Sequence, residues 1–227
     1  MGNGKNKWGT MILMMMVILI VTACGNNGQL TDSSELAGDD SALGRESYKS
    51  WYVTSVFLGD SITEGLSYHD VLEEENVLAG AGKTAQFALE NVDELVDRNP
   101  AHIYIQLGSD DLLWPTENPQ HYSLTHYAQL IDRLQAELPN ASITLLSVTP
   151  VTAEVEEAEP RYRNIPSYNK GLQELAAEAQ VGYVDLSSLI AEHPDLYDAD
   201  GIHFQAQFYP LLLEYLQETT DIQTSAK

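Results

Sequence analysis

Short β-rich runs alternate with amphipathic stretches along most of the chain. The runs are rich in Val, Ile, Leu and Tyr, and glycine or proline bounds most of their ends. They cover residues 51–59, 76–80, 101–108, 141–151 and 181–186. The stretches between them repeat apolar residues at three- and four-residue intervals. Because parallel strands need a crossover connection, this alternation predicts an α/β fold in which helices cover both faces of a parallel sheet.

Three predicted helices lie between the strands, and a fourth follows the last strand. They span residues 84–98, 123–138, 165–180 and 204–220, and Pro210 is expected to start the last one. The sequence contains no internal repeat, and no linker interrupts the pattern after residue 50. The sequence therefore predicts a single domain over residues 51–220, followed by a tail at 221–227.

Glycine and polar residues follow three of the predicted strands. Ser61 comes directly after the first strand, in the segment VFLGDSITEG. Gly80 and Gly82 follow the second strand, and residues 108–111 follow the third. The carboxyl ends of parallel strands meet at one edge of a sheet, so we expect these residues to converge.

A serine hydroxyl becomes a nucleophile only when a base removes its proton, and alone Ser61 would simply cap the next helix. The segment YDADGIHF contains a base, with Asp200 three residues before His203. If the carboxylate binds Nδ1 of the imidazole, the other ring nitrogen is free to accept the serine proton. Asp198 is the second candidate for the orienting acid.

These segments, in this order, resemble the four sequence blocks of the GDSL/SGNH hydrolase superfamily. The blocks are FLGDSITEG, a glycine after the second strand, QLGSDD after the third, and DGIH near the end. The resemblance spans roughly residues 53–215. It implies a flavodoxin-like three-layer α/β/α sandwich with a five-stranded parallel sheet in the order 2-1-3-4-5. It also implies hydrolysis of esters through an acyl-enzyme intermediate.

The resemblance assigns roles to individual residues. Ser61 is implied to be the nucleophile, His203 the general base and Asp200 its orienting acid. The backbone N–H groups of Ser61 and Gly82 are implied to hold the oxyanion, with Gly80 as the alternative glycine.

One block departs from the family pattern, which has Gly-x-Asn-Asp or Gly-x-Asn-Glu after the third strand. Here Asp110 stands where the family's oxyanion-binding asparagine is expected. An ionised carboxylate has no proton to donate, and losing one oxyanion donor costs about 10²–10³ in turnover. Three readings remain open: a protonated Asp110 donates, the Ser109 hydroxyl substitutes, or the chain is a weak or non-catalytic member.

Further residues are candidates for binding the substrate. Asp60, Asp111 and Trp114 are expected to contact it. The connection at 150–165 either flanks the active site or is a plain surface loop, and its acidic part, 154–159, is predicted to be a solvated loop. The basic and aromatic residues of this connection are Arg161, Tyr162 and Arg163.

The chain is strongly acidic, with 34 acidic and 11 basic residues and a formal net charge of −23. Such a surface repels phosphate backbones, which argues against nucleic acid as a partner. No nucleotide cofactor is expected, because GAGKT lacks the first glycine of a phosphate-binding loop, and no metal is expected, because the acidic residues are scattered. The expected substrate is a small acyl ester, such as an O-acetyl group on a glycan. A lysophospholipase-like lipase with a deep apolar channel, or a binding module without turnover, are the alternatives.

The N-terminal segment is predicted to be a targeting signal. Lys5 and Lys7 precede the apolar run MILMMMVILIV, which suits the h-region of a signal peptide at 1–23. The following VTAC resembles the lipobox of bacterial lipoproteins, which implies lipidation at Cys24. Residues 24–50 then form a flexible tether to an extracytoplasmic membrane surface. An uncleaved N-terminal anchor is the alternative.

Lipidation is tested by the Cys24→Ser variant. Without the thiol, the chain is expected to be released from the membrane fraction or to keep its signal uncleaved. Fractionation and the mass of the mature chain measure this. Normal cleavage together with unchanged membrane retention would contradict the lipid anchor.

Overall fold

The computed structural model describes residues 47–225, with side chains to residue 219. The predicted signal peptide, Cys24 and most of the predicted tether lie outside the described residues. Within the described part, no helix is both long enough and apolar enough to cross a membrane.

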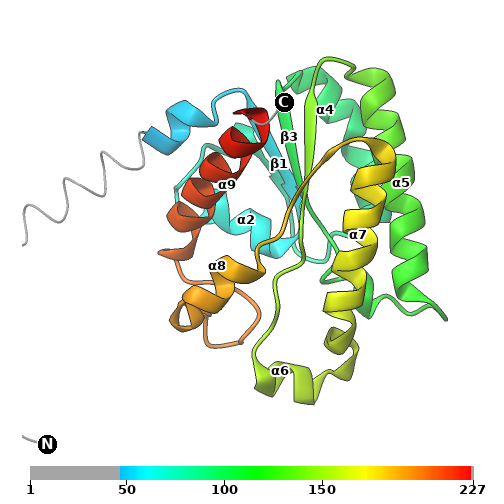
Figure 1. Cartoon of the computed structure of the whole chain (residues 1–227), viewed down its shortest axis with the longest axis vertical. Helices are drawn as coiled ribbons and strands as arrows, with labels where there is room; N and C mark the ends of the chain where they lie inside the picture. Colours follow the sequence, from blue (N-terminus) through cyan, green and yellow to red (C-terminus); the bar gives the residue numbers. More distant parts are fainter. Residues whose placement is uncertain (1–46, 226–227) are drawn as a thin grey trace, which may run out of the picture.

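A five-stranded parallel sheet forms the centre of the molecule, in the order β2-β1-β3-β4-β5 (Figure 1). This confirms the predicted topology. The strands are buried over most of their length, which explains why they are nearly continuous apolar runs. Their bounds are Ser55–Gly59 (β1), Val77–Ala79 (β2), His102–Gln106 (β3), Ser142–Leu146 (β4) and Gly182–Val184 (β5).

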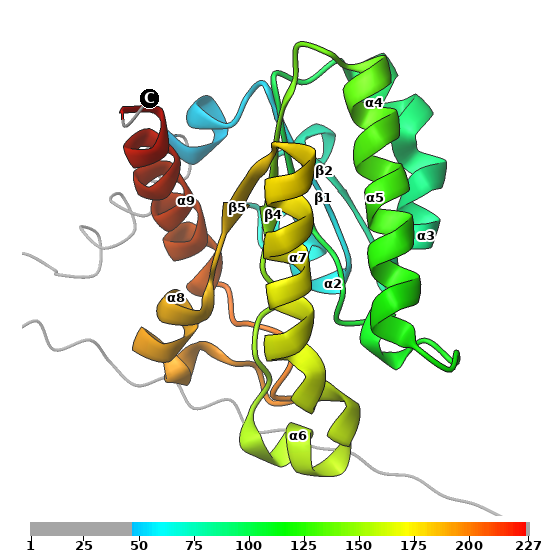
Figure 2. The ribbon, with the colours of Figure 1, turned by 45° about the vertical axis from the view of Figure 1, so that its right-hand side comes forward.

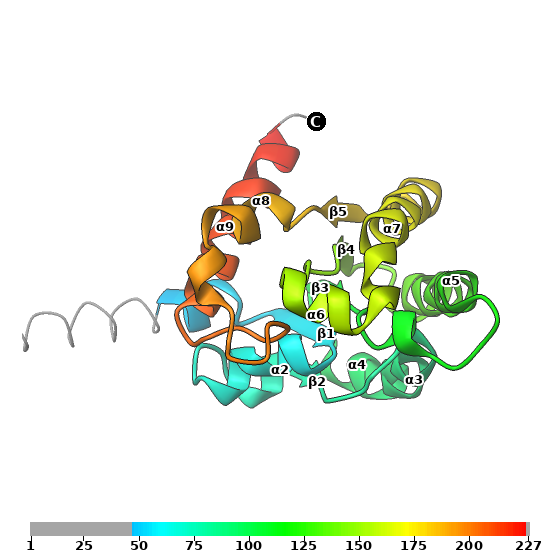
Figure 3. The same cartoon turned by 90° about the horizontal axis from the view of Figure 1, so that it is seen from below.

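Helices cover both faces of the sheet, as the view from below shows (Figure 3). One face carries α2 (Ser61–Tyr68), α8 (Ser187–Glu192) and α9 (Phe208–Ser225). The other carries α3 (Ala85–Ala88), α4 (Val92–Arg98), α5 (Pro119–Glu137) and α7 (Ile165–Ala179). In Figure 2, α7 lies in front of the strands and α5 lies to the right of them.

Each face of the sheet buries its own apolar core, because successive side chains on a strand point to opposite faces. Val56 and Leu58 of β1 belong to the core under α5 and α7. Phe57, between them, belongs to the core under α2 and α9, where it stacks on Tyr104 with ring centroids 4.7 Å apart.

The predicted domain boundaries are too narrow at both ends. Residues 47–51 form a helical turn, and Tyr48 is buried and donates a hydrogen bond to Glu214 of α9. Residues 47–50, which the predicted tether covered, are therefore part of the described fold. Helix α9 begins at Phe208, two residues before Pro210, and continues to Ser225, so most of the predicted tail is helical.

The connection at 150–165 is also more ordered than a solvated loop. It contains helix α6 (Ala153–Ala158) and the 3-10 helix η4 (Pro160–Asn164). Four further 3-10 turns are described: η1 (Glu74–Asn76), η2 (Leu89–Asn91), η3 (Asp111–Leu113) and η5 (Pro194–Leu196). Short amphipathic turns of this kind are hard to detect, because one or two apolar contacts suffice to hold them.

Two glycines of the GDSITEG segment are required by close packing. A Cβ on Gly59 would lie 2.0 Å from Oγ1 of Thr63, and one on Gly65 would lie 1.9 Å from the hydroxyl oxygen of Tyr209. The segment therefore lets α9 approach α2 closely, beside Ser61.

The Gly65→Ala variant is expected to lose about 1–3 kcal/mol of stability, because the added methyl group overpacks the contact with buried Tyr209. Denaturant unfolding measures the loss. Gly80→Ala is the matched control, since a Cβ at Gly80 meets nothing within 4 Å. Equal stability of the Gly65→Ala variant and the parent chain would contradict the packing argument.

Candidate active site

The candidate active site lies at the carboxyl edge of the sheet, where β1 passes directly into α2. Asp60 caps the helix, and its carboxylate accepts a hydrogen bond from the backbone N–H of Ile62 at 3.0 Å. Ser61 is the first residue of α2, so its own backbone N–H has no acceptor within the helix. The turn therefore presents both the hydroxyl and the N–H of Ser61 at the sheet edge.

The structure brings Ser61 and His203 together, although they are 142 residues apart in the chain. Oγ of Ser61 lies 2.8 Å from Nε2 of His203, and Nδ1 of the same ring lies 2.5 Å from Oδ2 of Asp200. With the Nδ1–H donating to the carboxylate, Nε2 is left to accept from the Ser61 hydroxyl. The three side chains thus have the geometry of a nucleophile, its base and an orienting acid.

A tight turn holds Asp200 in place. Its Oδ1 accepts hydrogen bonds from the backbone N–H groups of Ile202 and His203, each at 2.9 Å. Burial alone would raise the pKa of Asp200, but the hydrogen bonds from His203 and from these N–H groups bring it below its usual value. Asp198, the second candidate, instead accepts from the N–H of Ala199 at 2.7 Å.

Of the two candidate oxyanion glycines, only Gly82 has its N–H turned toward the site. The N–H of Gly80 donates to the carbonyl of Gly59 at 3.3 Å, at the end of the pairing of β1 with β2. The N–H of Gly82 faces the carboxyl group of Asp110. Gly82 has φ +75°, and a Cβ there would meet nothing within 4 Å, so backbone conformation and not crowding favours glycine.

Asp110 is half-buried at the same edge, between Gly82 and His203. Burial raises the pKa of Asp110 above its usual value, while the electrostatic interaction with His203 and the N–H of Gly82 favour the ionised form. The carboxyl groups of Asp60 and Asp111 and the hydroxyl of Tyr162 are the other titratable groups whose charges interact with Asp110.

Ser109 is poorly placed to substitute for the missing asparagine. Its buried hydroxyl donates to Oδ2 of Asp60 at 2.8 Å. Gly108 before it has φ +136°, and a Cβ there would lie 2.3 Å from the ring of Tyr168. The backbone therefore turns Ser109 into the protein, and Asp110 is left facing the site.

Asp60 and Asp111 lie beneath the site, which corrects the expectation that they contact the substrate. Each is 2% exposed. Asp111 accepts from the N–H of Ala85 at 3.1 Å and so anchors the start of α3. Burial raises the pKa of Asp60 to about 7, and the negative charges of Asp110 and Asp111 add to this, while hydrogen bonds from Ser109 and Ile62 oppose it. Both carboxyl groups position the strand ends.

Trp114 packs edge-on against Phe87, with ring centroids 5.5 Å apart. This pair lies on the side of the site formed by α3 and η3. Its contact with substrate stays a prediction.

Among the cavities formed by the described residues, one is lined by both Ser61 and His203 and another lies along α7. The smaller, of about 240 Å³, is lined by Ser61, Glu64, Gly65, Tyr68, His69, Asp198, His203, Phe204 and Tyr209. Glu64 and Tyr68 were not identified from the sequence as residues of the site. A signal for them was the helical spacing, which places Tyr68 one turn after Glu64. Among residues 47–219, no group of three or more His, Cys, Asp or Glu side chains could hold a metal ion.

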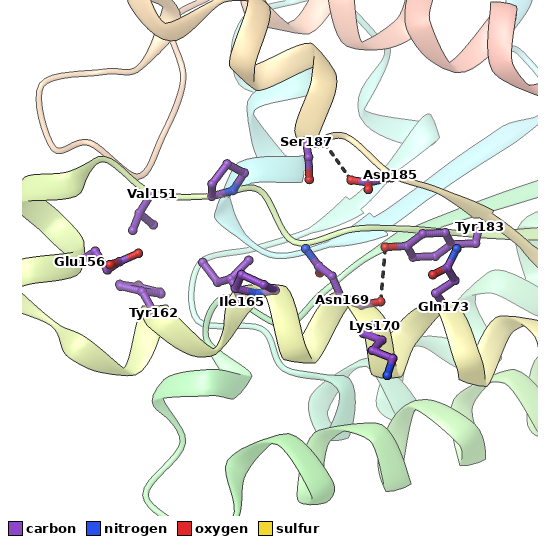
Figure 4. A pocket seen from close by; sticks show the side chains of 12 residues that line it. Val151, Glu156, Tyr162, Ile165, Asn169, Lys170, Gln173, Tyr183, Asp185 and Ser187 are labelled. Carbon is purple, nitrogen blue, oxygen red and sulfur yellow. Dashed lines mark hydrogen bonds between the residues drawn. The ribbon is translucent and has the colours of Figure 1, made fainter.

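The larger cavity, of about 320 Å³, lies along α7 and is shown in Figure 4. Val151, Glu156, Tyr162 and Ile165 of the connection line one end of it. At the other end, Asn169 of α7 faces Tyr183 of β5, whose hydroxyl donates to the Asn169 carbonyl at 3.3 Å. Neither Ser61 nor His203 lines this cavity. The connection therefore borders a second cavity.

Comparison with known proteins identifies the family of the chain. Residues 57–211 match the model of the GDSL-like Lipase/Acylhydrolase family. The chain belongs to this family of hydrolases. No curated protein matches the chain.

Solved structures of low identity share the fold. A GDSL-like lipase from Bacteroides thetaiotaomicron superposes with a TM-score of 0.62 at 19% identity, over 84% of this chain and 97% of that one. An acetylxylan esterase from Geobacillus stearothermophilus gives a TM-score of 0.56 at 16% identity, over 72% of this chain and 91% of that one. The latter is also described as an acetyl-xylooligosaccharide esterase.

Proposed function

We propose that this hydrolase cleaves short acyl esters, with O-acetyl groups on a glycan as the class of substrate. The observation that carries the proposal is the 2.8 Å contact between Oγ of Ser61 and Nε2 of His203, with Asp200 2.5 Å behind the ring. A hydroxyl in this position loses its proton to the imidazole as it attacks a carbonyl carbon.

The proposed reaction proceeds in two halves. His203 takes the proton of Ser61 while Oγ bonds to the acyl carbon, and the imidazolium then protonates the departing alcohol. A water molecule attacks the resulting acyl-enzyme after losing a proton to His203, and the carboxylic acid leaves as the C–Oγ bond breaks and Ser61 regains its proton. Asp200 stabilises the imidazolium in both halves.

In this proposal, the oxyanion is held by the N–H groups of Ser61 and Gly82 and by the protonated carboxyl of Asp110. Asp110 serves as a donor only when it carries a proton, because the ionised form repels the developing charge. Its partial burial favours the protonated form. Ser109 is excluded from this role because it already donates to Asp60.

The cavity beside Ser61 offers no deep apolar channel for a lipid chain. It holds only about 240 Å³ and also includes polar Glu64 and Asp198, whereas a lysophospholipase needs a deep apolar channel. The structural likeness to an acetylxylan esterase supports the same class of substrate.

The proposal places the enzyme on the outer face of a membrane, anchored by a lipid on Cys24. The lipobox-like VTAC and the preceding apolar run support this location.

Hydrolysis of p-nitrophenyl acetate by the soluble domain, residues 47–227, tests the esterase proposal. Turnover is expected in the parent domain, and Ser61→Ala is expected to reduce kcat by at least about 10³-fold, because the nucleophile is lost. Ser67→Ala is the matched control, since Ser67 lies on the same helix and donates only to the carbonyl of Glu64. Equal activity of the parent and Ser61→Ala domains would overturn the proposal.

The role of Asp110 predicts a specific pH dependence. The raised pKa of Asp110 keeps it protonated to a higher pH than usual, and turnover should fall as the pH rises through that pKa. Asp110→Asn supplies a permanent donor, so it is expected to exceed the parent by about 10-fold or more at pH 8, with the difference shrinking at lower pH. The kcat of both domains across pH 5–9 measures this.

Asp195→Asn is the control for the change in charge, because Asp195 is exposed on the loop before the catalytic turn. The ratio of the parent kcat to the Asp195→Asn kcat is expected to stay constant with pH. An Asp110→Asn domain that is slower than the parent at every pH would show that the carboxyl group, and not an amide, is required.

A further inference from the structure

The cavity beside Ser61 has an aromatic wall that the catalytic residues do not use. Tyr68 and His69 meet edge-to-face, with ring centroids 4.9 Å apart, and His69 and Tyr209 follow at 5.1 Å. The series leads from the open surface to Tyr209, which is buried at the base of α9. It ends in the same cavity as Ser61 and His203.

Tyr68 is the outermost ring of this wall. It is 82% exposed, so its ring contributes little burial to the stability of the fold. An exposed aromatic face at the mouth of a catalytic cavity offers a flat apolar surface to a ligand. Sugar rings have C–H groups on their faces and hydroxyl groups along their edges, and therefore match such a surface.

Two carboxylates complete the wall with hydrogen-bond acceptors. Glu64 lies one helical turn before Tyr68 and so shares its face of α2, and Asp198 approaches from the loop before His203. Both are exposed, and within the described residues neither forms an ion pair. Carboxylate oxygens accept hydrogen bonds from hydroxyl groups.

The charge of these groups restricts the ligand further. A phosphate or a uronic acid would be repelled by Glu64, Asp198 and the net charge of −23, whereas a neutral polyol would not. Gly82 and Asp110 do not line this cavity. The oxyanion is therefore held on one side of Ser61, and the cavity is left for another part of the ester.

We infer that this cavity binds the sugar ring of an uncharged acylated saccharide, with Tyr68 against the face of the ring and Glu64 and Asp198 accepting its hydroxyl groups. The inference rests on the proposed function, because it identifies the alcohol part of the ester. Tyr68 is then a residue that determines specificity.

The first test compares two esters that share an acetyl group but differ in the alcohol. The kcat/KM values for acetylated xylooligosaccharide and for methyl acetate, which has no ring, are measured by release of acid. Tyr68→Ala is expected to lower the ratio of these two values about 10-fold, mainly through the KM of the saccharide, because the contact is made in the ground state as well as in the transition state. Glu64→Gln is expected to lower it less.

Gln173→Ala is the matched control, because Gln173 lines the larger cavity along α7. It is expected to leave the ratio unchanged. If Gln173→Ala lowered this ratio of kcat/KM values and Tyr68→Ala did not, the saccharide would lie in that larger cavity and the inference would be overturned. An equal loss toward both esters in Tyr68→Ala would also overturn it, because the residue would then serve catalysis in general.

The second test does not depend on turnover. Binding of deacetylated xylotetraose to the Ser61→Ala domain is measured by calorimetry, with and without Tyr68→Ala. Weaker binding in the double variant supports the inference even if the domain hydrolyses no ester. The absence of hydrolysis would defeat only the esterase proposal. Ester hydrolysis with an unchanged affinity for xylotetraose in the double variant would defeat only the sugar site.

Discussion

The buried carboxyl group of Asp60 connects the parts of the site that must meet. It caps α2 through the N–H of Ile62 and receives the hydroxyl of Ser109, so one side chain joins the end of β1 to the end of β3. These two strands are neighbours in the sheet, which brings Ser61 and Asp110 to the same edge. Burial raises the pKa of Asp60 to about 7, because the protein interior disfavours a charge there.

Three carboxyl groups gathered at one edge have a consequence for the chemistry. Burial raises the pKa of Asp60, Asp110 and Asp111, and the charge of Asp110 raises the pKa of the other two further, so protons are retained within the group to a higher pH than isolated side chains would allow. In the proposed reaction, Asp110 takes the place of an amide donor only because such surroundings let it keep a proton. The substitution of aspartate for asparagine and the burial of its neighbours therefore have to be considered together.

Much of the fold follows from local pattern. The alternation of apolar runs and amphipathic stretches predicts the parallel sheet, and the resemblance of four short segments predicts its strand order, which the structure confirms. The short elements were harder to predict, because they have few apolar positions; they are the helical turn at 47–51, α6 and the 3-10 helices. Such elements depend on long-range contacts, such as that of Tyr48 with Glu214. The expected substrate contacts of Asp60 and Asp111 were wrong, because a polar residue after a strand can point inward as well as outward.

The sequence by itself determined which residues are available for the chemistry: a serine after the first strand, an Asp-x-x-His turn near the end, and an aspartate in place of an amide donor. Only the tertiary structure decided which atoms meet. In the folded chain the N–H of Gly80 donates to Gly59 and the hydroxyl of Ser109 donates to Asp60, whereas the N–H of Gly82 faces Asp110. The tertiary structure also places Tyr68 beside Ser61. The physical reason is that hydrogen-bond partners and burial depend on segments far apart in the chain, and no local pattern specifies them.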